Sequence, residues 1–347
     1  MAIGSLTPEN RHRRRRALAL LASAALACAA AGPARAQSAG AAAVAAAAPD
    51  PDALPDDAFG RAVRYGRDLI VHTSALIGPD APDPAQRYAG NGLECENCHL
   101  AAGTKPFGQP LARAWAAFPT FIPRDGAVRT LADRINGCLE RSMNGRSLAE
   151  TSAEMAAMLA YLRFLNQRPP GEPANAPPTP PLALPERPLD PAHGGQVFAQ
   201  QCAACHGQDG LGQRLDARTA AVQRRRYAVP PLWGPDSFND GAGMARPITA
   251  ARFIRANMPF GTDPAHPALG VADAFDVAAF VETQPRPHFP RRVQDYPDLW
   301  LKPVDAAFPP LLGPFSAQQH RLGPWPPIQA WLQANRPKPA AGATGSE

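Results

Sequence analysis

The chain has 347 residues, which is long enough for two or three domains, and a formal charge of +5. Residues 1–36 hold six arginines and one glutamate, so their removal would bring the formal charge to about zero. The basic balance of the whole chain therefore does not indicate a nucleic-acid partner.

Residues 1–36 have the three parts of a secretory signal peptide. Five arginines lie between positions 11 and 16, an apolar run of Ala and Leu follows over residues 17–31, and Ala34-Arg35-Ala36 is a small-residue cleavage site. The apolar run is too short and too rich in alanine for a membrane span. We therefore expect a periplasmic protein with no transmembrane segment in its mature form. Attachment of a lipid anchor at Cys28 is the alternative that the sequence leaves open.

A first helical unit is predicted after a leader. Residues 37–52 are nearly all Ala, Gly and Pro and are expected to be flexible. Apolar residues then recur at helical spacing in three segments, residues 59–77, 130–139 and 147–166. In the last of these, Ser152 can cap the helix and Met155 and Met158 lie on its apolar face. Residues 106–123, rich in Pro, Gly and aromatics, are predicted to form a loop.

A proline-rich connector separates this unit from a second one. Ten prolines lie between residues 167 and 191, so residues 168–191 are assigned to an extended, semi-rigid linker. Beyond it, helices are predicted over residues 194–201, 250–257 and 273–283. Residues 286–347 combine many prolines with Trp300, Trp325 and Trp331. We expect these residues to form an irregular strap packed over a domain.

Each unit contains one C-x-x-C-H motif, the attachment signature of c-type haem. The cysteines Cys95 and Cys98, and Cys202 and Cys205, can form thioethers to one edge of a porphyrin, and the following His99 or His206 can then bind the iron. Two matches in an exported chain predict two covalently bound haems c. The order of helix, motif, irregular stretch and final helix is typical of the small all-α cytochrome c unit. The sequence thus predicts an all-α fold with two cytochrome c-like domains, residues 53–167 and 192–285.

The second haem has a methionine as its expected distal ligand. Met258 lies fifty-two residues after His206, at the end of a predicted helix and before a proline. His/Met ligation favours reduced iron and suits electron transfer. Met244 is the competing candidate, and either methionine could instead fill the core.

The first haem leaves two candidates open. Cys28 leaves with the signal peptide and the motifs use four cysteines, so Cys138 is the single cysteine that remains. A thiolate ligand would stabilise ferric haem and would also be a nucleophile. Arginines surround this cysteine in the sequence, at positions 124, 129, 134, 141 and 146. The alternatives are Met143 as ligand and an inert, buried Cys138.

At these residues the chain resembles the dihaem thiosulfate dehydrogenases. The most specific match is residues 134–145, which carry Cys138 between Arg134 and the sequence Arg141-Ser142. Residues 91–106, 237–244, 253–259 and 296–328 are similar as well. The resemblance extends over nearly the whole mature chain.

The resemblance implies His99 and Cys138 as ligands of the first iron, and His206 and Met258 as ligands of the second. Some family members have lysine before that methionine as an alternative ligand, where this chain has Asn257. It also implies that Arg124, Arg134 and Ser142 contact substrate, together with Arg141 and Asn144. The implied reaction couples two thiosulfates to tetrathionate, reversibly, with Cys138 as the covalent catalyst. Electrons would pass from haem 1 to haem 2 and then to a small c-type cytochrome or a high-potential redox protein.

Two rival functions remain at this point. In one, the protein is a pure electron carrier with Met143 on the first iron. In the other, the same cysteine acts on a different sulfur oxyanion. A dihaem peroxidase would not explain the arginine-flanked cysteine.

Overall fold

The computed structural model describes residues 49–166, 179–215 and 226–337. The predicted signal peptide, most of the predicted leader and about half of the predicted linker lie outside the described residues. Within these ranges no helix is both long enough and apolar enough to cross a membrane.

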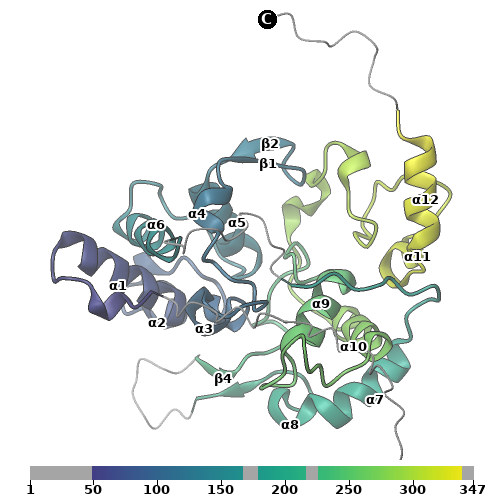
Figure 1. The fold of residues 1–347 in the computed structure, drawn as a ribbon, viewed down its shortest axis with the longest axis horizontal. Coiled ribbons are helices and arrows are strands. Elements are labelled where there is room, and N and C mark those ends of the chain that lie inside the picture. Colours follow the sequence, from purple (N-terminus) through teal and green to yellow (C-terminus); the bar gives the residue numbers. More distant parts are fainter. Residues whose placement is uncertain (1–48, 167–178, 216–225, 338–347) are drawn as a thin grey trace, which may run out of the picture. The chain divides into compact units, whose positions relative to one another are not determined.

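The first half of the chain is mainly helical (Figure 1). In chain order its elements are η2 (Pro51–Ala53), α1 (Ala58–Val71), α2 (Thr73–Ile77), η3 (Pro84–Gln86), η4 (Cys95–Asn97), α3 (Leu100–Gly103), α4 (Ala114–Ala117), β1 (Thr120–Ile122), β2 (Ala127–Arg129), α5 (Leu131–Arg141) and α6 (Ala153–Leu165).

Local side-chain caps decide where the longer helices of this half begin. The Asp57 carboxylate accepts from the Gly60 amide at the start of α1, and Ser152 caps α6 as predicted. Thr130 and Asp133 form a reciprocal capping box at the start of α5. The helix predicted over residues 59–77 is divided at His72, which leaves the helical conformation (φ −125°, ψ 39°).

The second half repeats the helical plan with α7 and α10 in the places of α1 and α6. Its elements are α7 (Pro191–Gln201), α8 (Ala203–His206), β3 (Gln213–Arg214), β4 (Tyr227–Val229), α9 (Pro247–Asn257) and α10 (Val271–Thr283). The remaining described elements are η5 (Pro290–Gln294), η6 (Leu299–Leu301), α11 (Ala317–Leu322) and α12 (Pro326–Asn335).

A glycine lies at the helix crossing of each half. A Cβ on Gly66 of α1 would stand 2.1 Å from the Ala157 carbonyl oxygen of α6. A Cβ on Gly194 of α7 would stand 1.9 Å from the Asp276 carbonyl oxygen of α10. Only a residue without a side chain allows backbones to approach this closely. The two halves thus pack their first and last helices in the same way.

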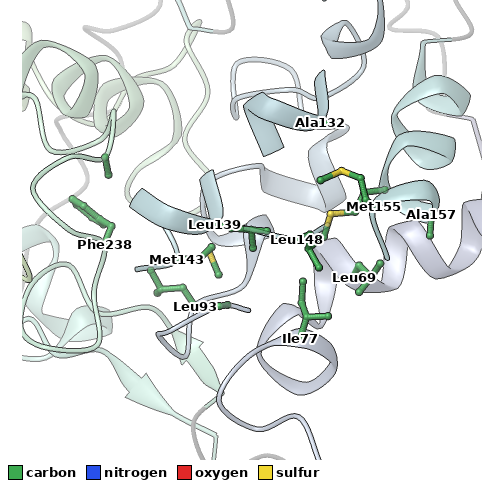
Figure 2. Packing of buried hydrophobic residues seen from close by; sticks show 13 residues of the cluster. Leu69, Ile77, Leu93, Ala132, Leu139, Met143, Leu148, Met155, Ala157 and Phe238 are labelled. Carbon is green, nitrogen blue, oxygen red and sulfur yellow. The ribbon is translucent and has the colours of Figure 1, made fainter. Parts of the chain in front are cut away.

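The core of the first half is drawn in Figure 2. Met155 and Met158 are buried there, as their helical spacing predicted, and Met143 lies among Leu139 and Leu93. Phe238, from the second half of the chain, also belongs to this cluster. The hydrophobic core is therefore continuous from the first half into the loop that follows β4.

The C-terminal segment is more regular than predicted, because it contains α11 and α12. Ser316 caps α11, and Pro326 occupies the first position of α12, where a proline is compatible with a helix. Trp325 and Ile328 are fully buried against residues of α9 and α10, including Ala251 and Phe275.

The structure also contains two small sheets, which the predicted all-α fold did not include. Strand β1 pairs antiparallel with β2, and β3 pairs antiparallel with β4. Strands of two or three residues are too short for an alternating pattern to be visible. Residues 106–123, predicted to be a loop, accordingly contain α4 and β1.

Candidate functional site

The first C-x-x-C-H motif forms a turn beside α1. Cys95 begins η4, and its amide donates to the Thr73 hydroxyl at 3.1 Å. His99 follows this turn, with its Nδ1 atom 2.6 Å from the Gln109 carbonyl oxygen. Gln109 has a positive φ of 52°, a conformation that costs energy for a residue with a side chain and aims this carbonyl at the ring. With Nδ1 bound to the backbone, the Nε2 atom of His99 is available to a metal.

Cys138 of α5 faces this motif. Burial, with a smaller contribution from the charge of Cys138, raises the pKa of the Cys95 and Cys98 thiols to about 12. Cys138 behaves in the opposite way. Burial opposes its ionisation, but the charge of Arg134, the His99 ring and the charge of Arg124 together lower its pKa to about 6. Three sulfur atoms and His99 therefore meet in one place, and only Cys138 is electrostatically favoured as a thiolate.

One face of α5 presents the residues that the resemblance singled out. Arg134, Cys138 and Ser142 follow one another at intervals of four residues, which places them on the same side of the helix. The Arg134 Nη1 atom donates to the Cys138 sulfur at 2.9 Å. Ser142 ends the helix, and its carbonyl oxygen accepts from the Asn91 side chain at 3.0 Å. Met143, the alternative ligand, is buried in the core described above.

Arg141 is occupied by a partner far away in the sequence. Its guanidinium binds both carboxylate oxygens of Asp295, at 2.8 and 2.6 Å, and lies 4.1 Å from the centre of the Phe289 ring. A third contact joins Arg141 Nη1 to the Gly241 carbonyl oxygen at 3.2 Å. Both side chains of the ion pair are almost fully buried, with 11% and 7% exposed. This arrangement anchors the end of α5 to the C-terminal segment.

Asn144 is engaged in a similar way. Its side-chain oxygen accepts from Asn239 Nδ2 at 3.2 Å, and the same Asn239 amide donates to the Glu140 carbonyl oxygen at 2.9 Å. The loop that contains Asn239 thus holds the C-terminal end of α5.

Arg124 is held by Tyr296. The Tyr296 amide donates to the Arg124 carbonyl oxygen at 2.8 Å, and Tyr296 has a positive φ of 62°. Burial would lower the pKa of Arg124, but Tyr296, Asp295 and Asp125 raise it above its ordinary value. A cavity of about 280 Å³ opens beside Arg124 and Arg134.

The second C-x-x-C-H motif lies at α8. The His206 Nδ1 atom is 2.9 Å from the Pro230 carbonyl oxygen, which again leaves Nε2 available. Burial lowers the pKa of this histidine, and the Pro230 contact opposes that effect only in part. Burial and the neighbouring Cys205 raise the pKa of Cys202 to about 11, whereas Cys205 itself is exposed.

The methionine candidates for the second haem lie on either side of α9. Met258 is the C-terminal cap of this helix and its amide donates to the Ile254 carbonyl oxygen. Met244 precedes the helix and packs against the cores of both halves. Asn257 is buried, and its side-chain amide donates to the Phe107 carbonyl oxygen at 2.9 Å. Asn257 thus makes a neutral contact with the loop after His99.

Both motifs fit haem c. Each provides two cysteines for thioether bonds and a histidine whose Nδ1 atom is fixed by a backbone carbonyl, as is usual for a metal ligand.

Three residues of this region were not found from the sequence: Arg246, Asp295 and Tyr296. Each lies more than a hundred residues after Cys138 and reaches the site only through the fold. The positive φ of Tyr296 is a structural signal that no sequence pattern carries.

Comparisons with known proteins agree with this description. Residues 86–168 match the model of the SoxA/TsdA cytochrome c domain, and residues 191–285 match the cytochrome c model. The predicted fold of two cytochrome c units is therefore confirmed.

Among curated relatives, the thiosulfate dehydrogenase of Allochromatium vinosum is 42% identical over 241 residues, which cover 68% of this chain and 82% of that protein. The thiosulfate dehydrogenase of Stutzerimonas stutzeri is 38% identical over 242 residues, which cover 70% and 73% of the two chains. The solved structure of thiosulfate dehydrogenase (TsdBA) from Marichromatium purpuratum, in its as-isolated form, superposes with a TM-score of 0.61 at 35% identity. That match covers 70% of this chain and half of the solved one.

Proposed function

Because this chain belongs to the dihaem thiosulfate dehydrogenases, we propose that it couples two thiosulfate ions to one tetrathionate ion in the periplasm. The same site would carry out the reverse reduction, and the haem potentials would set the direction. The observation that carries this proposal is the position of Cys138, which lies between His99 and Arg134 with its pKa lowered to about 6.

The arginines have a clear electrostatic purpose in this reaction. Two thiosulfate dianions repel each other, and guanidinium groups offset that repulsion and orient sulfonate oxygens through charge-assisted hydrogen bonds. Arg134 contacts the Cys138 sulfur and Arg124 lines the adjoining cavity, so these two residues are assigned to the first thiosulfate. Ser142, on the same face of α5, is assigned to its sulfonate.

The covalent steps need only two thiosulfate ions, the Cys138 thiolate and an acceptor for two electrons. The Cys138 thiolate bonds the outer sulfur of one thiosulfate, and this oxidation releases two electrons. A second thiosulfate then attacks the same sulfur with its own outer sulfur, which releases tetrathionate and restores the thiolate. Haem c held by the two motifs would supply one-electron acceptors for these two electrons.

Arg141 and Asn144 are given a positioning role. Arg141 is committed to Asp295, and the Asn144 side chain is committed to Asn239. We assign both residues to holding the end of α5, whereas the resemblance assigned them to substrate contact.

The remaining assignments concern the haems and their partners. His99 and Cys138 would ligate the first iron, and His206 and Met258 would ligate the second. Cys95, Cys98, Cys202 and Cys205 would hold the two haems covalently. An external electron acceptor, a small c-type cytochrome or a high-potential redox protein, would take electrons from the second haem.

The test is rapid mixing of the oxidised, haem-loaded protein with thiosulfate, followed by absorbance. Reduction of the haems is expected in the parent and should be lost in Cys138→Ala while two haems remain attached. Met143→Leu is the matched control, because it changes the alternative ligand and should leave reduction intact. If thiosulfate does not reduce the parent and tetrathionate does not oxidise the reduced protein, the proposed function is wrong.

A further inference from the structure

The cavity beside Arg134 is lined by both halves of the chain. On one side lie residues of β1 and α5, among them Ile122 and Gly137, and on the other side lie Arg246, Tyr296 and Leu301. Its volume of about 280 Å³ is at the small end of ligand pockets, which suits small anions. Arg246 is the only one of its arginines that the second half contributes.

The arginines of this cavity differ in how far they are already neutralised. Arg129 is paired with Asp125 at 2.9 Å, Arg141 is paired with Asp295 at 2.6 Å, and Arg246 is partly balanced by Asp305 at the longer distance of 3.3 Å. In the described ranges no carboxylate lies within 4.0 Å of the guanidinium of Arg124 or Arg134. Arg134 also donates to the Cys138 sulfur, and it is released from that negative charge only when the thiolate bonds the first thiosulfate. Arg124 and Arg134 can then balance the bound sulfonate, but the second thiosulfate brings two further negative charges to the same place.

Arg246 is held at the cavity wall with donors to spare. Its Nη1 atom lies 3.3 Å from the Asp305 carboxylate, and its Nη2 atom donates to Thr249 at 2.8 Å. Its Nε atom is buried and has no hydrogen-bond partner among the described residues. Asp305 is fully buried and also accepts from the Ile248 amide at 3.0 Å, so this carboxylate is fixed by the backbone of α9. The side chain of Arg246 remains 28% exposed, toward the cavity that it lines.

A second cavity, of about 260 Å³, shares Arg124, Arg246 and Tyr296 with the first. It adds Arg286, Arg292 and Arg321 to its wall, of which Arg286 is paired with Glu282 and Arg292 with Asp240, two acidic residues of the same wall. Arg246 thus lies where two arginine-lined cavities meet, and an anion that approaches Arg134 through either of them encounters this guanidinium.

We propose that Arg246 is the binding residue of a second anion subsite, which takes the sulfonate group of the second thiosulfate or the far sulfonate of tetrathionate. This inference rests on the proposed function, because it concerns the partner of the sulfur bound to Cys138. Arg134 and Arg124 hold the sulfonate of the first thiosulfate, which carries one negative charge once its outer sulfur is bonded to Cys138. Arg246 offsets the charge of the second thiosulfate, a dianion, as its outer sulfur attacks. Asp305 partly balances the charge of Arg246, so that the product dianion can leave.

Calorimetric titration of thiosulfate into the fully reduced haem-loaded protein measures binding without turnover, because reduced haems cannot accept electrons. Two anions should bind to the parent and one to Arg246→Ala. In steady-state turnover with ferricyanide as the acceptor, Arg246→Ala should raise KM for thiosulfate roughly tenfold to a hundredfold, the value of a charge-assisted hydrogen bond. Arg246→Lys should fall in between, since it keeps the charge but loses the fork of donors.

The control variants separate binding from structure. Asp305→Asn keeps Arg246 but removes its counter-charge, so KM for thiosulfate should fall or stay unchanged. If the ion pair were only structural, Asp305→Asn and Arg246→Ala would raise KM alike. Arg129→Ala removes an already neutralised arginine of the same wall and should change KM less than twofold.

Two results would overturn the subsite: one bound anion in the parent, or equal increases of KM in Arg246→Ala and Asp305→Asn. A parent that binds two anions through Arg246 but does not oxidise thiosulfate would instead refute the proposed function and keep the subsite.

Discussion

The ion pair between Arg141 and Asp295 permits a sharp test of how the site is held together. The two residues are 154 positions apart and meet through two hydrogen bonds, with both side chains almost fully buried. The changes are Asp295→Asn, Arg141→Met and the two combined. Each single change leaves a polar group of the partner buried without its counter-charge.

The expected loss in Asp295→Asn is about 3 kcal/mol, the lower end of the range for breaking a buried ion pair, because Arg141 keeps its contacts with the Gly241 carbonyl oxygen and the Phe289 ring. Arg141→Met also removes these contacts and should lose more, about 4–5 kcal/mol. The double variant should lose less than the sum of the single losses, by about 1–3 kcal/mol, because the second change removes a group that is already unsatisfied.

Urea unfolding of the haem-loaded proteins, followed by far-ultraviolet circular dichroism, measures these free energies. The same proteins are assayed for KM. A large rise of KM in Arg141→Met with an unchanged free energy of unfolding would refute the reasoning and return Arg141 to the substrate contacts. Strictly additive losses would also refute it, because they would mean that the two residues do not act as a pair.

The other predictions concern the crossing of α1 with α6 and the loss of stability at low pH through Asp276. Gly66→Ala should lower the free energy of unfolding by about 2–3 kcal/mol, because its Cβ would overlap the Ala157 carbonyl. Gly137→Ala is the control and should raise the free energy of unfolding by about 0.5–1 kcal/mol, because no atom lies within 4 Å of the added Cβ. Equal effects of the two variants in urea unfolding would contradict the close approach of α1 to α6 at Gly66. Burial would raise the pKa of Asp276, but Arg187 and other hydrogen-bond donors lower it. Its contribution to stability is therefore present at neutral pH and lost as the pH falls below about 4. Asp276→Asn should cost about 2 kcal/mol at pH 7 and approach the parent in thermal unfolding at pH 3; a constant gap would contradict this.

The features that the sequence determined are those that depend on neighbouring residues. A C-x-x-C-H motif needs only five consecutive positions, and the cap at Ser152 needs four, so the two cytochrome c units and this helix start could be predicted. The family was recognisable for the same reason, because Arg134, Cys138 and Ser142 occur within one helix, and the relatives confirm it.

Tertiary structure alone decided how the arginines around Cys138 are used. Positive charges at positions 124, 129, 134 and 141 look equivalent in the sequence, but the fold brings Asp295 to Arg141 and leaves Arg134 on the Cys138 sulfur. Arg246 reaches the same cavity from a helix more than a hundred residues away. The free energy of a buried charge depends on which partner lies within a few ångströms, and that distance is set by the packing of distant segments.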